Sequence, residues 1–354
     1  MKIATAKSGT YLQEDIYKYT LSNDNNVEIS VLSYGGTITD ITIPDKDSGL
    51  RNIVLALDCF ESYINNPLYP GATLGPNAGR LQDGVLKIGS NTYLLSRNDG
   101  NHNLHGGFVS VSYMNWIKKE IKQNNNSISL TLCTFLEDGQ DGYPGNRQIT
   151  ATYTLDNTDR LTIDYEASTD KDTYFNLSNH TYFNLTGDLN HSGLEQILTI
   201  NADTYIRNNS EHLPVEFCPV DASPFDFRRP VTLQENLLHY PNHSQLKNSR
   251  GYNNGFDIRK AVEKAEPVLS LWSPDKTAGL RMYTDAPCLV VYSGGFIENS
   301  YKLKNGIKLT KSCALALEAQ DFPDVFHFGE NFVKITRKKE RFKRKITYEF
   351  LYQT

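Results

Sequence analysis

Two side chains with complementary acid–base chemistry stand at unusual places in this sequence. His180 lies in the middle of FNLSNHTYFNL (175–185), whose Phe, Tyr and Leu residues are typical of a buried strand. Glu318 directly follows the apolar run CALAL (313–317). An ionisable group in an apolar segment costs free energy unless it is paired or functional. A carboxylate and a histidine can together act as general base and general acid.

Each of these side chains also has a purely structural explanation. A histidine among apolar residues is often a core residue with satisfied hydrogen bonds, and Glu318 could mark the point where a strand emerges into water. Asn176, Asn179 and Asn184 lie on both sides of His180. Because buried amides need hydrogen-bond partners, so many of them in one segment favours an organised site.

Two glycine-containing segments carry further polar side chains. GATLGPNAGRL (71–81) surrounds Arg80 with glycines, and NHNLHGG (101–107) contains His102 and His105. Glycine allows close approach of a ligand, and arginine can offer several donors to ligand oxygens. The first segment lacks the Lys-Ser/Thr of a phosphate loop, which leaves a solvated turn as its alternative. No other cluster completes a ligand set for the His-x-x-His pair, so we expect no metal.

Together these groups indicate a ligand that is rich in oxygen. A general acid, a general base and the donors of Arg80 and His105 suit the hydroxyls and the ring oxygen of a sugar. The sequence therefore favours a small-molecule sugar as the partner.

The elements that must position these residues are mainly strands. QITATYTL (148–155) and LTIDYEA (161–167) alternate apolar and polar residues, as do SISLTLCTF and KITYEFLY. This period of two predicts strands with one packed face and one wet face. Helical signals are short: 231–240 is one candidate, and PDVFHF (323–328) could form a single turn. We expect an all-β fold, a single large antiparallel β-sandwich over residues 1–354.

Composition argues against several classes of function. The 354 residues carry a formal net charge of -5, which does not favour nucleic acid or an anionic membrane surface. We interpret the basic cluster RKKERFKRK (337–345) as a solvated hairpin. The five cysteines form no CxxC pair, and the longest apolar runs are far shorter than the roughly twenty residues of a membrane span. No secretory signal is visible, so we expect a cytoplasmic protein without membrane partners.

Four segments, in this order, resemble the aldose 1-epimerase family, the galactose mutarotases. They are NAGRL, NLHGG, NHTYFNL and LEAQDFPD, and they match the family's Ala-Asn-Arg, Leu-His-Gly-Gly, Asn-His-x-Tyr-Phe-Asn-Leu and Glu-x-Gln patterns. SYGGTITDITIPD, DGYPGN and SPFDFR are similar to flanking family segments. The likeness runs from about residue 27 to about residue 350.

The resemblance implies a large antiparallel β-supersandwich with an open carbohydrate cleft. It implies that Glu318 is the general base and His180 the general acid, with Arg80, His105 and Tyr182 in contact with the substrate. The implied isomerase exchanges the α and β anomers of a hexose such as galactose or glucose by opening and closing the ring, without a cofactor. Ordinary pKa values of roughly 4.3 for Glu and 6.5 for His nearly allow an ionised base beside a protonated acid at neutral pH, and a neighbouring charge would help.

The sequence departs from the family pattern where the sugar is held. Gly79 replaces the Asn of Ala-Asn-Arg, Pro76 stands where an Arg is common, and Val290 stands where a Gln is frequent. In GYNNGFD, Asn253 occupies the position of an Asp that binds sugar hydroxyls, and Asp257 is a second candidate for that role. The acid and the base are retained while the sugar contacts differ, so the preferred sugar stays open.

Two other functions therefore remain as alternatives. One is an epimerase for another or a phosphorylated sugar, for which Arg228 and Arg229 are the nearest basic residues. The other is a non-catalytic carbohydrate-binding protein, although binding alone needs no acid and base. We expect a monomer or a homodimer.

Overall fold

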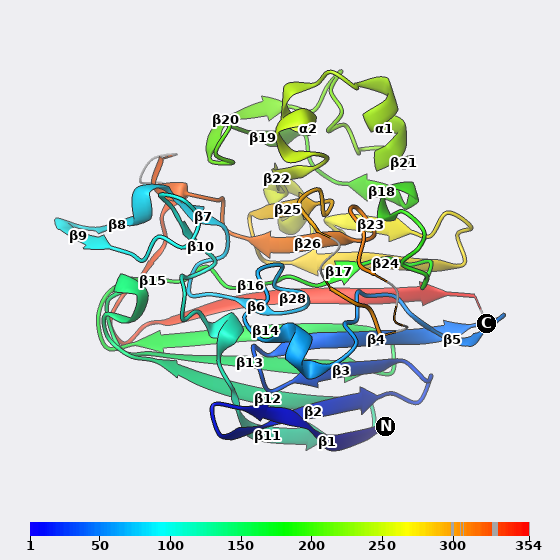
Figure 1. Ribbon diagram of the computed structural model, residues 1–354, viewed down its shortest axis with the longest axis horizontal. Helices are drawn as coiled ribbons and strands as arrows, with labels where there is room; N and C mark the ends of the chain where they lie inside the picture. The colour runs from blue at the N-terminus through cyan, green and yellow to red at the C-terminus, as the bar shows by residue number, and fades with distance from the viewer. Residues whose placement is uncertain (299–300, 305, 307, 328–331, 354) are drawn as a thin grey trace.

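Three antiparallel sheets make up most of the fold (Figure 1). The computed structural model describes residues 1–298, 301–304, 306, 308–327 and 332–353. The first sheet has the order β1-β2-β3-β4-β5 and is built from consecutive strands. Its strands are β1 (Lys2–Tyr11), β2 (Glu14–Ser22), β3 (Glu28–Leu32), β4 (Thr37–Asp45) and β5 (Gly49–Asn52).

The largest sheet crosses the whole molecule and joins distant parts of the chain. Its order is β11-β12-β13-β14-β28-β24-β23-β18-β21, so the C-terminal strand β28 lies in its middle (Figure 1). Its strands are β11 (Ile117–Gln123), β12 (Ser127–Leu136), β13 (Arg147–Asp156), β14 (Arg160–Thr169), β18 (Ile197–Ile200), β21 (Val231–Thr232), β23 (Leu269–Trp272), β24 (Ala278–Thr284) and β28 (Arg341–Tyr352). The predicted pair 148–155 and 161–167 is confirmed as β13 and β14.

The third sheet carries the candidate site and has the order β17-β26-β25-β22-β19-β20. Its strands are β17 (Tyr182–Phe183), β19 (Thr204–Asn208), β20 (Pro214–Pro219), β22 (Asn253–Asp257), β25 (Cys288–Tyr292) and β26 (Leu315–Gln320). The described residues also form four separate two-stranded sheets: β6 (Thr73–Leu74) with β16 (Ser178–Asn179), β7 (Arg80–Leu81) with β10 (Asn103–Leu104), β8 (Val85–Ile88) with β9 (Asn91–Leu94), and β15 (Thr173–Tyr174) with β27 (Ile335–Thr336).

The largest apolar cluster of the described residues draws side chains from all three sheets. It takes Ile29 and Ile41 from the first sheet, Ile163 from the largest and Leu315 and Leu317 from the third. Alternation explains this arrangement, because every second side chain of each strand points to the same face. The expected all-β antiparallel sandwich is confirmed.

Helices are short and lie at the periphery. The candidate at 231–240 is confirmed as α1 (Leu233–His239), which Thr232 and Glu235 cap reciprocally in the manner of a capping box. The segment 323–328 contains one turn of 3₁₀ helix, Val325–His327, while Phe328 lies outside the described residues. The sequence did not predict α2 (Ser244–Ser249) or α3 (Arg259–Glu263). No helix among the described residues is long and apolar enough to cross a membrane.

The basic cluster 337–345 pairs largely with acidic side chains. Lys343 contacts Glu166, and Lys345 contacts Asp164, on the neighbouring strand β14. Arg344 is buried and contacts Asp321 at 2.7 Å. Only residues 337–340 form the expected exposed turn; residues 341–345 already belong to β28, and the burial of Arg344 corrects the interpretation of the whole cluster as solvated.

Candidate active site

The third sheet offers one face to a cavity, and Glu318 lies near the centre of that face. In β26, Ala316, Glu318 and Gln320 alternate with residues of the apolar core. Glu318 pairs across the sheet with Val290, which in turn pairs with Gly255. Glu318 is buried, so the idea that the strand emerges into water at this residue is wrong.

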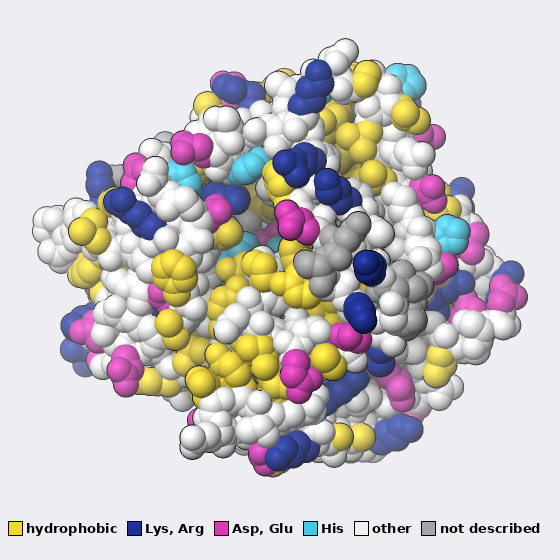
Figure 2. All heavy atoms as spheres, in the orientation of Figure 1, with side chains coloured by type: hydrophobic (Ala, Val, Ile, Leu, Met, Phe, Trp, Pro, Cys, Tyr) yellow, Lys and Arg dark blue, Asp and Glu magenta, His cyan; other side chains and the backbone are white. Residues whose placement is uncertain are grey.

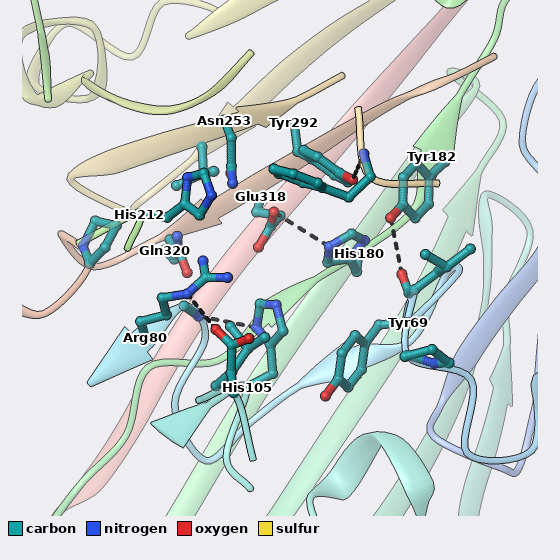
Figure 3. A pocket seen from close by; sticks show the side chains of 18 of the residues that line it. Tyr69, Arg80, His105, His180, Tyr182, His212, Asn253, Tyr292, Glu318 and Gln320 are labelled. Atoms are coloured by element: carbon teal, nitrogen blue, oxygen red, sulfur yellow. Dashed lines mark hydrogen bonds and ion pairs between the residues drawn. The ribbon is translucent and has the colours of Figure 1, made fainter. Parts of the chain in front are cut away.

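His180 approaches Glu318 from the adjoining segment between β16 and β17. Its backbone N–H donates to Ala72 O at 2.9 Å, and its carbonyl accepts from Gly71 N–H at 3.0 Å. Its ring is buried, and its Nε2 lies 3.6 Å from Oε1 of Glu318 (Figure 3). The structure therefore brings the predicted acid and base face to face.

The three asparagines around His180 tie the site segments together. Asn176 accepts a hydrogen bond from Asp321 N–H at the end of β26 and donates to Ala78 O in the arginine loop. Asn179 donates to Gly71 O, and Asn184 donates to Cys313 O just before β26. Their side chains hold the backbone segments that carry His180, Arg80 and Glu318, which is a positioning function.

His105 stands beside His180 in a strained backbone conformation. Its φ is +51°, in a region that non-glycine residues seldom occupy and that often marks functional sites. Its Nδ1 accepts from Gly79 N–H at 3.1 Å, and its own N–H donates to Gly79 O at 3.1 Å. A neutral imidazole whose Nδ1 accepts carries its proton on Nε2, so the ring can donate to a ligand. Burial, together with the nearby His180 and Arg80, holds the pKa of His105 well below its usual value.

The side chain of Arg80 is held in place by the carboxylate of Asp99. Its Nε contacts Asp99 Oδ2 at 2.7 Å (Figure 3). This contact fixes the guanidinium while its terminal nitrogens stay available as donors. Gly79, next to it, has a φ of +78°. Asn and Gly both tolerate this left-handed region, which accounts for glycine where the family pattern has Asn.

All seven predicted site residues line one cavity of about 610 Å³. Figure 2 looks into the hollow in the middle of this face, with histidine side chains in and around it. The predicted residues in the lining are Gly79, Arg80, His105, His180, Tyr182, Asn253 and Glu318. Such a volume is ordinary for a small-molecule site.

The structure also places the residues that depart from the family pattern. Asn253 lines the cavity, whereas Asp257 pairs with Arg259 at 2.6 Å, so Asn253 is the residue in position to contact a sugar. Val290 lines the cavity beside Glu318, because the two residues pair between the adjacent strands β25 and β26. Pro76 packs against Gly106 and is not part of the described cavity lining.

Sequence reasoning missed several lining residues. Gln320 lies two residues beyond Glu318 on the same face, and its buried Oε1 has no hydrogen-bond partner among the described residues. Strand alternation could have found it, and likewise Tyr292, two residues after Val290. Tyr69 and His212 come from irregular segments with positive φ, and no periodic signal marks them.

The protonation of Glu318 and His180 differs from the expectation drawn from ordinary pKa values. Burial raises the pKa of Glu318 to about 8, an effect that Arg80 partly opposes. Burial lowers the pKa of His180 to about 4. Desolvation disfavours the charged form of each group, so burial favours a protonated carboxyl beside a neutral imidazole over the ion pair.

This burial predicts a specific dependence of stability on pH. Because the folded pKa of Glu318 lies above its unfolded value, this carboxyl binds its proton more tightly in the folded chain between about pH 4.5 and 8, and its contribution to stability falls as pH rises through that window. The lowered pKa of His180 acts in the opposite direction between about pH 4 and 6.5, so the comparison is made with a variant that differs only at Glu318. Glu318→Gln removes this loss, so its melting temperature exceeds that of the wild type by more at pH 8 than at pH 5. Thermal unfolding followed by circular dichroism at both pH values measures the difference. An equal difference in melting temperature at the two pH values would contradict a raised pKa of Glu318 in the folded chain.

The His-x-x-His pair does not converge on one point. His102 accepts from Asp83 N–H and lies near Glu211 rather than in the described cavity lining. His105, His180 and Glu318, however, bring ligand atoms within 4.8 Å of one another. A divalent cation could bridge such a set, so assays of this site need a chelator as a control.

Comparisons with known proteins identify the class of this fold and site. Residues 17–349 match the family model described as aldose 1-epimerase. Galactose mutarotase of Mus musculus is 31% identical over 310 residues, which is 87% of this chain and 86% of the relative. Maltose epimerase of Levilactobacillus brevis is 26% identical over 351 residues, 99% of each chain. The crystal structure of galactose 1-epimerase from Lactobacillus acidophilus NCFM has a TM-score of 0.87 and 29% identity, and the match covers 100% of this chain and 99% of that one.

The fold and the comparisons together define a sugar isomerase of the β-supersandwich class. The chain belongs to the aldose 1-epimerase family. It interconverts the anomers of a sugar, as the resemblance in its motifs implies.

Proposed function

We propose that this protein interconverts the α and β anomers of an aldohexose such as galactose or glucose, with Glu318 and His180 as the proton-transferring pair. The observation that carries the proposal is their placement 3.6 Å apart at a cavity lined by hydrogen-bonding side chains. Arg80, His105, Tyr182, Asn253 and the backbone at Gly79 hold the sugar.

The reaction needs two proton transfers on one substrate. Ionised Glu318 takes the proton of the hydroxyl on C1 while protonated His180 donates a proton to the ring oxygen, and the bond between C1 and the ring oxygen breaks. The product is an open-chain aldehyde. Rotation about the C1–C2 bond exposes the other face of the carbonyl, and the two transfers reverse.

Burial assists the ring-opening step itself. A carboxylate whose pKa is raised is a stronger base, and an imidazolium whose pKa is lowered is a stronger acid. After ring opening, Glu318 carries the proton and His180 is neutral, which is the protonation state that burial favours. The cost is that the reactive state, with Glu318 ionised and His180 protonated, is less populated. Attraction between the two charges at 3.6 Å offsets part of this cost.

The proposal is tested by polarimetry on freshly dissolved α-D-galactose and α-D-glucose in a buffer that contains a chelator. We expect the rotation of at least one sugar to relax faster with the protein than without it, and the ratio of the two rates ranks the sugars. A relaxation that stays at the spontaneous rate for both would contradict the proposal.

The shared proton predicts a bell-shaped pH profile of kcat/KM. Above about pH 8 the pair loses its proton and no acid remains, and below about pH 4 it gains a second proton and no base remains. Both limits belong to the pair rather than to one residue. Relaxation rates corrected for the spontaneous reaction measure the profile. Activity that keeps rising well above pH 8 would contradict this assignment.

The proposal includes two further features. The five cysteines are free thiols, which supports a location in the cytoplasm, and we propose a monomer or a homodimer. A phosphorylated substrate has less support, because Arg228 is engaged by Asp221 and Asp226 and neither it nor Arg229 is among the described lining residues.

A further inference from the structure

The backbone at His105 needs support from other parts of the chain. His105, Gly106 and Gly107 have φ values of +51°, +89° and +107°, so three consecutive residues have a positive φ. Glycine adopts such angles readily, whereas histidine is strained there. Such strain persists only where the surrounding structure holds the residue in place. The contacts on both sides of His105 therefore decide whether its imidazole keeps its position in the cavity.

Asp141 holds the chain just after the strained histidine. Its Oδ1 accepts the N–H of Phe108 at 2.9 Å, and its Oδ2 accepts the N–H of Val109 at 2.9 Å. The hydroxyl of Ser96 also donates to Oδ1, at 2.6 Å. Both carboxylate oxygens are thus used, and hydrogen bonds to a charged acceptor are stronger than those between neutral groups. A Cβ atom on Gly107 would overlap this carboxylate, so a glycine at that position allows the close approach.

Tyr143 holds the chain just before the strained histidine. Its hydroxyl donates to Oδ1 of Asn103 at 2.7 Å, and both residues are fully buried. Asn103 in turn donates from Nδ2 to Ser96 O at 2.8 Å. The strand β10, which contains Asn103, leads directly into His105. Tyr143 and Asp141 therefore hold the chain two residues before His105 and three and four residues after it.

The loop that carries Asp141 and Tyr143 is itself fixed by a buried cation. Arg147, at the start of β13, is fully buried, and its guanidinium lies 5.6 Å from the centroid of the Tyr143 ring. The guanidinium donates to three carbonyl oxygens of the loop, those of Glu137, Gln140 and Gly145. These bonds attach the loop to the largest sheet, so the loop is a rigid support for the chain around His105.

The place of this chain segment determines which nitrogen of His105 faces a ligand. Nδ1 accepts from Gly79 N–H at 3.1 Å (Figure 3), and the backbone N–H of His105 donates to Gly79 O at 3.1 Å. With Nδ1 in use, the neutral ring presents its Nε2–H to the cavity. A ring nitrogen of His105 lies within 4.8 Å of polar atoms of His180 and Glu318. A small shift of the segment therefore moves a hydrogen-bond donor at the reacting centre.

We propose that Asp141 and Tyr143 are positioning residues for His105. They hold its strained backbone so that Nδ1 meets Gly79 and Nε2–H points to the sugar. Neither residue is part of the described cavity lining, and neither takes part in the proton transfers. The expected effect on catalysis rests on the proposed function, whereas the expected effect on the imidazole does not.

Asp141→Asn is the variant that tests this proposal most directly. Asparagine tolerates the φ of +52° at this position, but it offers one acceptor oxygen where the carboxylate offers two. One of the two backbone N–H groups then loses its acceptor, and we expect kcat/KM for the preferred hexose to fall about tenfold or more. Tyr143→Phe, which removes only the bond to Asn103, lowers it in the same direction by a smaller factor. Circular dichroism shows whether each variant folds.

A double-mutant cycle with His105→Ala separates positioning from a general loss of stability. If Asp141 acts through His105, Asp141→Asn changes kcat/KM by less than about twofold once residue 105 is alanine, although the melting temperature still falls. Asp138→Asn is the matched control, because it alters a carboxylate of the same loop that accepts Gly145 N–H at 2.7 Å and contacts Lys171. We expect it to lower the melting temperature and to leave kcat/KM within about twofold.

Nitrogen NMR of the imidazole rings gives a second measurement that does not depend on turnover. The signals of His105 are assigned by their loss in His105→Ala. In the wild type they show a protonated Nε2 and an unprotonated Nδ1 that accepts a hydrogen bond. We expect a mixture of the two tautomers in Asp141→Asn and no change from the wild type in Asp138→Asn.

The outcomes separate this inference from the proposed function. Unchanged His105 signals in Asp141→Asn overturn it, and so does an equal loss of kcat/KM with and without the His105 ring. If Asp141→Asn does not fold, Tyr143→Phe is put through both measurements in its place. If the wild type accelerates no hexose, the proposed function fails, and the NMR comparison alone supports or overturns the positioning of His105.

Discussion

Glu318→Gln lowers the rate of enzyme-catalysed anomer interconversion by about 10²–10⁴-fold. The amide keeps the shape of the side chain and its position on β26, where residue 318 pairs with Val290 of β25. It cannot, however, take the proton from the hydroxyl on C1. Because Glu318 is buried and its carboxyl carries a raised pKa, loss of its charge does not destabilise the fold. Polarimetric relaxation of the preferred hexose measures the effect.

The control for this variant is an exposed glutamate on an edge strand of the same sheet. Glu216→Gln on β20 removes a carboxylate that pairs with Arg207 at the surface and leaves the rate unchanged. A rate for Glu318→Gln within tenfold of the wild type would show that another group acts as the base.

His180→Asn has the second large expected effect, again about 10²–10⁴-fold. An asparagine side chain can donate a hydrogen bond to the ring oxygen but cannot transfer a proton to it. The ring of His180 packs beside Tyr182 with centroids 4.8 Å apart, so circular dichroism must show that the variant folds. The same polarimetric assay measures its rate.

The combined variant distinguishes a catalytic pair from two independent contacts. Groups that act as a unit are strongly non-additive, so Glu318→Gln/His180→Asn is scarcely slower than either single variant. His191→Asn, which replaces an exposed histidine, is the matched control and keeps full activity. Multiplication of the two single losses in the double variant would argue against a shared proton.

Local pattern predicted the regular part of this fold well, and the hairpin of β13 and β14 shows why. Ile149, Ala151 and Tyr153 alternate with threonines and all join the core, so the sequence itself records which face is buried. The order of the strands lies outside such a pattern. That β28 inserts between β14 and β24 depends on pairing between segments far apart in the sequence, such as Arg160 with Glu349.

The identity of the site residues could be predicted from the sequence, whereas the distances between them and their protonation could not. Glu318 and His180 were identified because each interrupts an apolar segment, but their mutual distance follows from the pairing of β17 with β26. Their protonation could not be predicted, because desolvation depends on how completely surrounding segments cover both groups. The pairing of Asn253 on β22 with Tyr292 on β25 likewise could not be predicted without the register of the sheet.

Irregular backbone explains the residues that were missed. His212 and Tyr69 reach the cavity from positions with φ of +61° and +50°, and neither belongs to a periodic segment. Gln320 was overlooked for a different reason, since the alternation that includes Glu318 also includes it. Applying the period of two to the end of β26 would have added it to the site.

The central claim is that the protein exchanges anomers by opening the ring at Glu318 and His180 without breaking any carbon–hydrogen bond. Exchange NMR of the preferred hexose at anomeric equilibrium in deuterated buffer tests this claim most directly. The account predicts exchange between the α and β H1 signals in the wild type, its reduction to the spontaneous rate in Glu318→Gln, and no deuterium at C1 or C2. Absence of enhanced exchange, or incorporation of deuterium at C2, would contradict it.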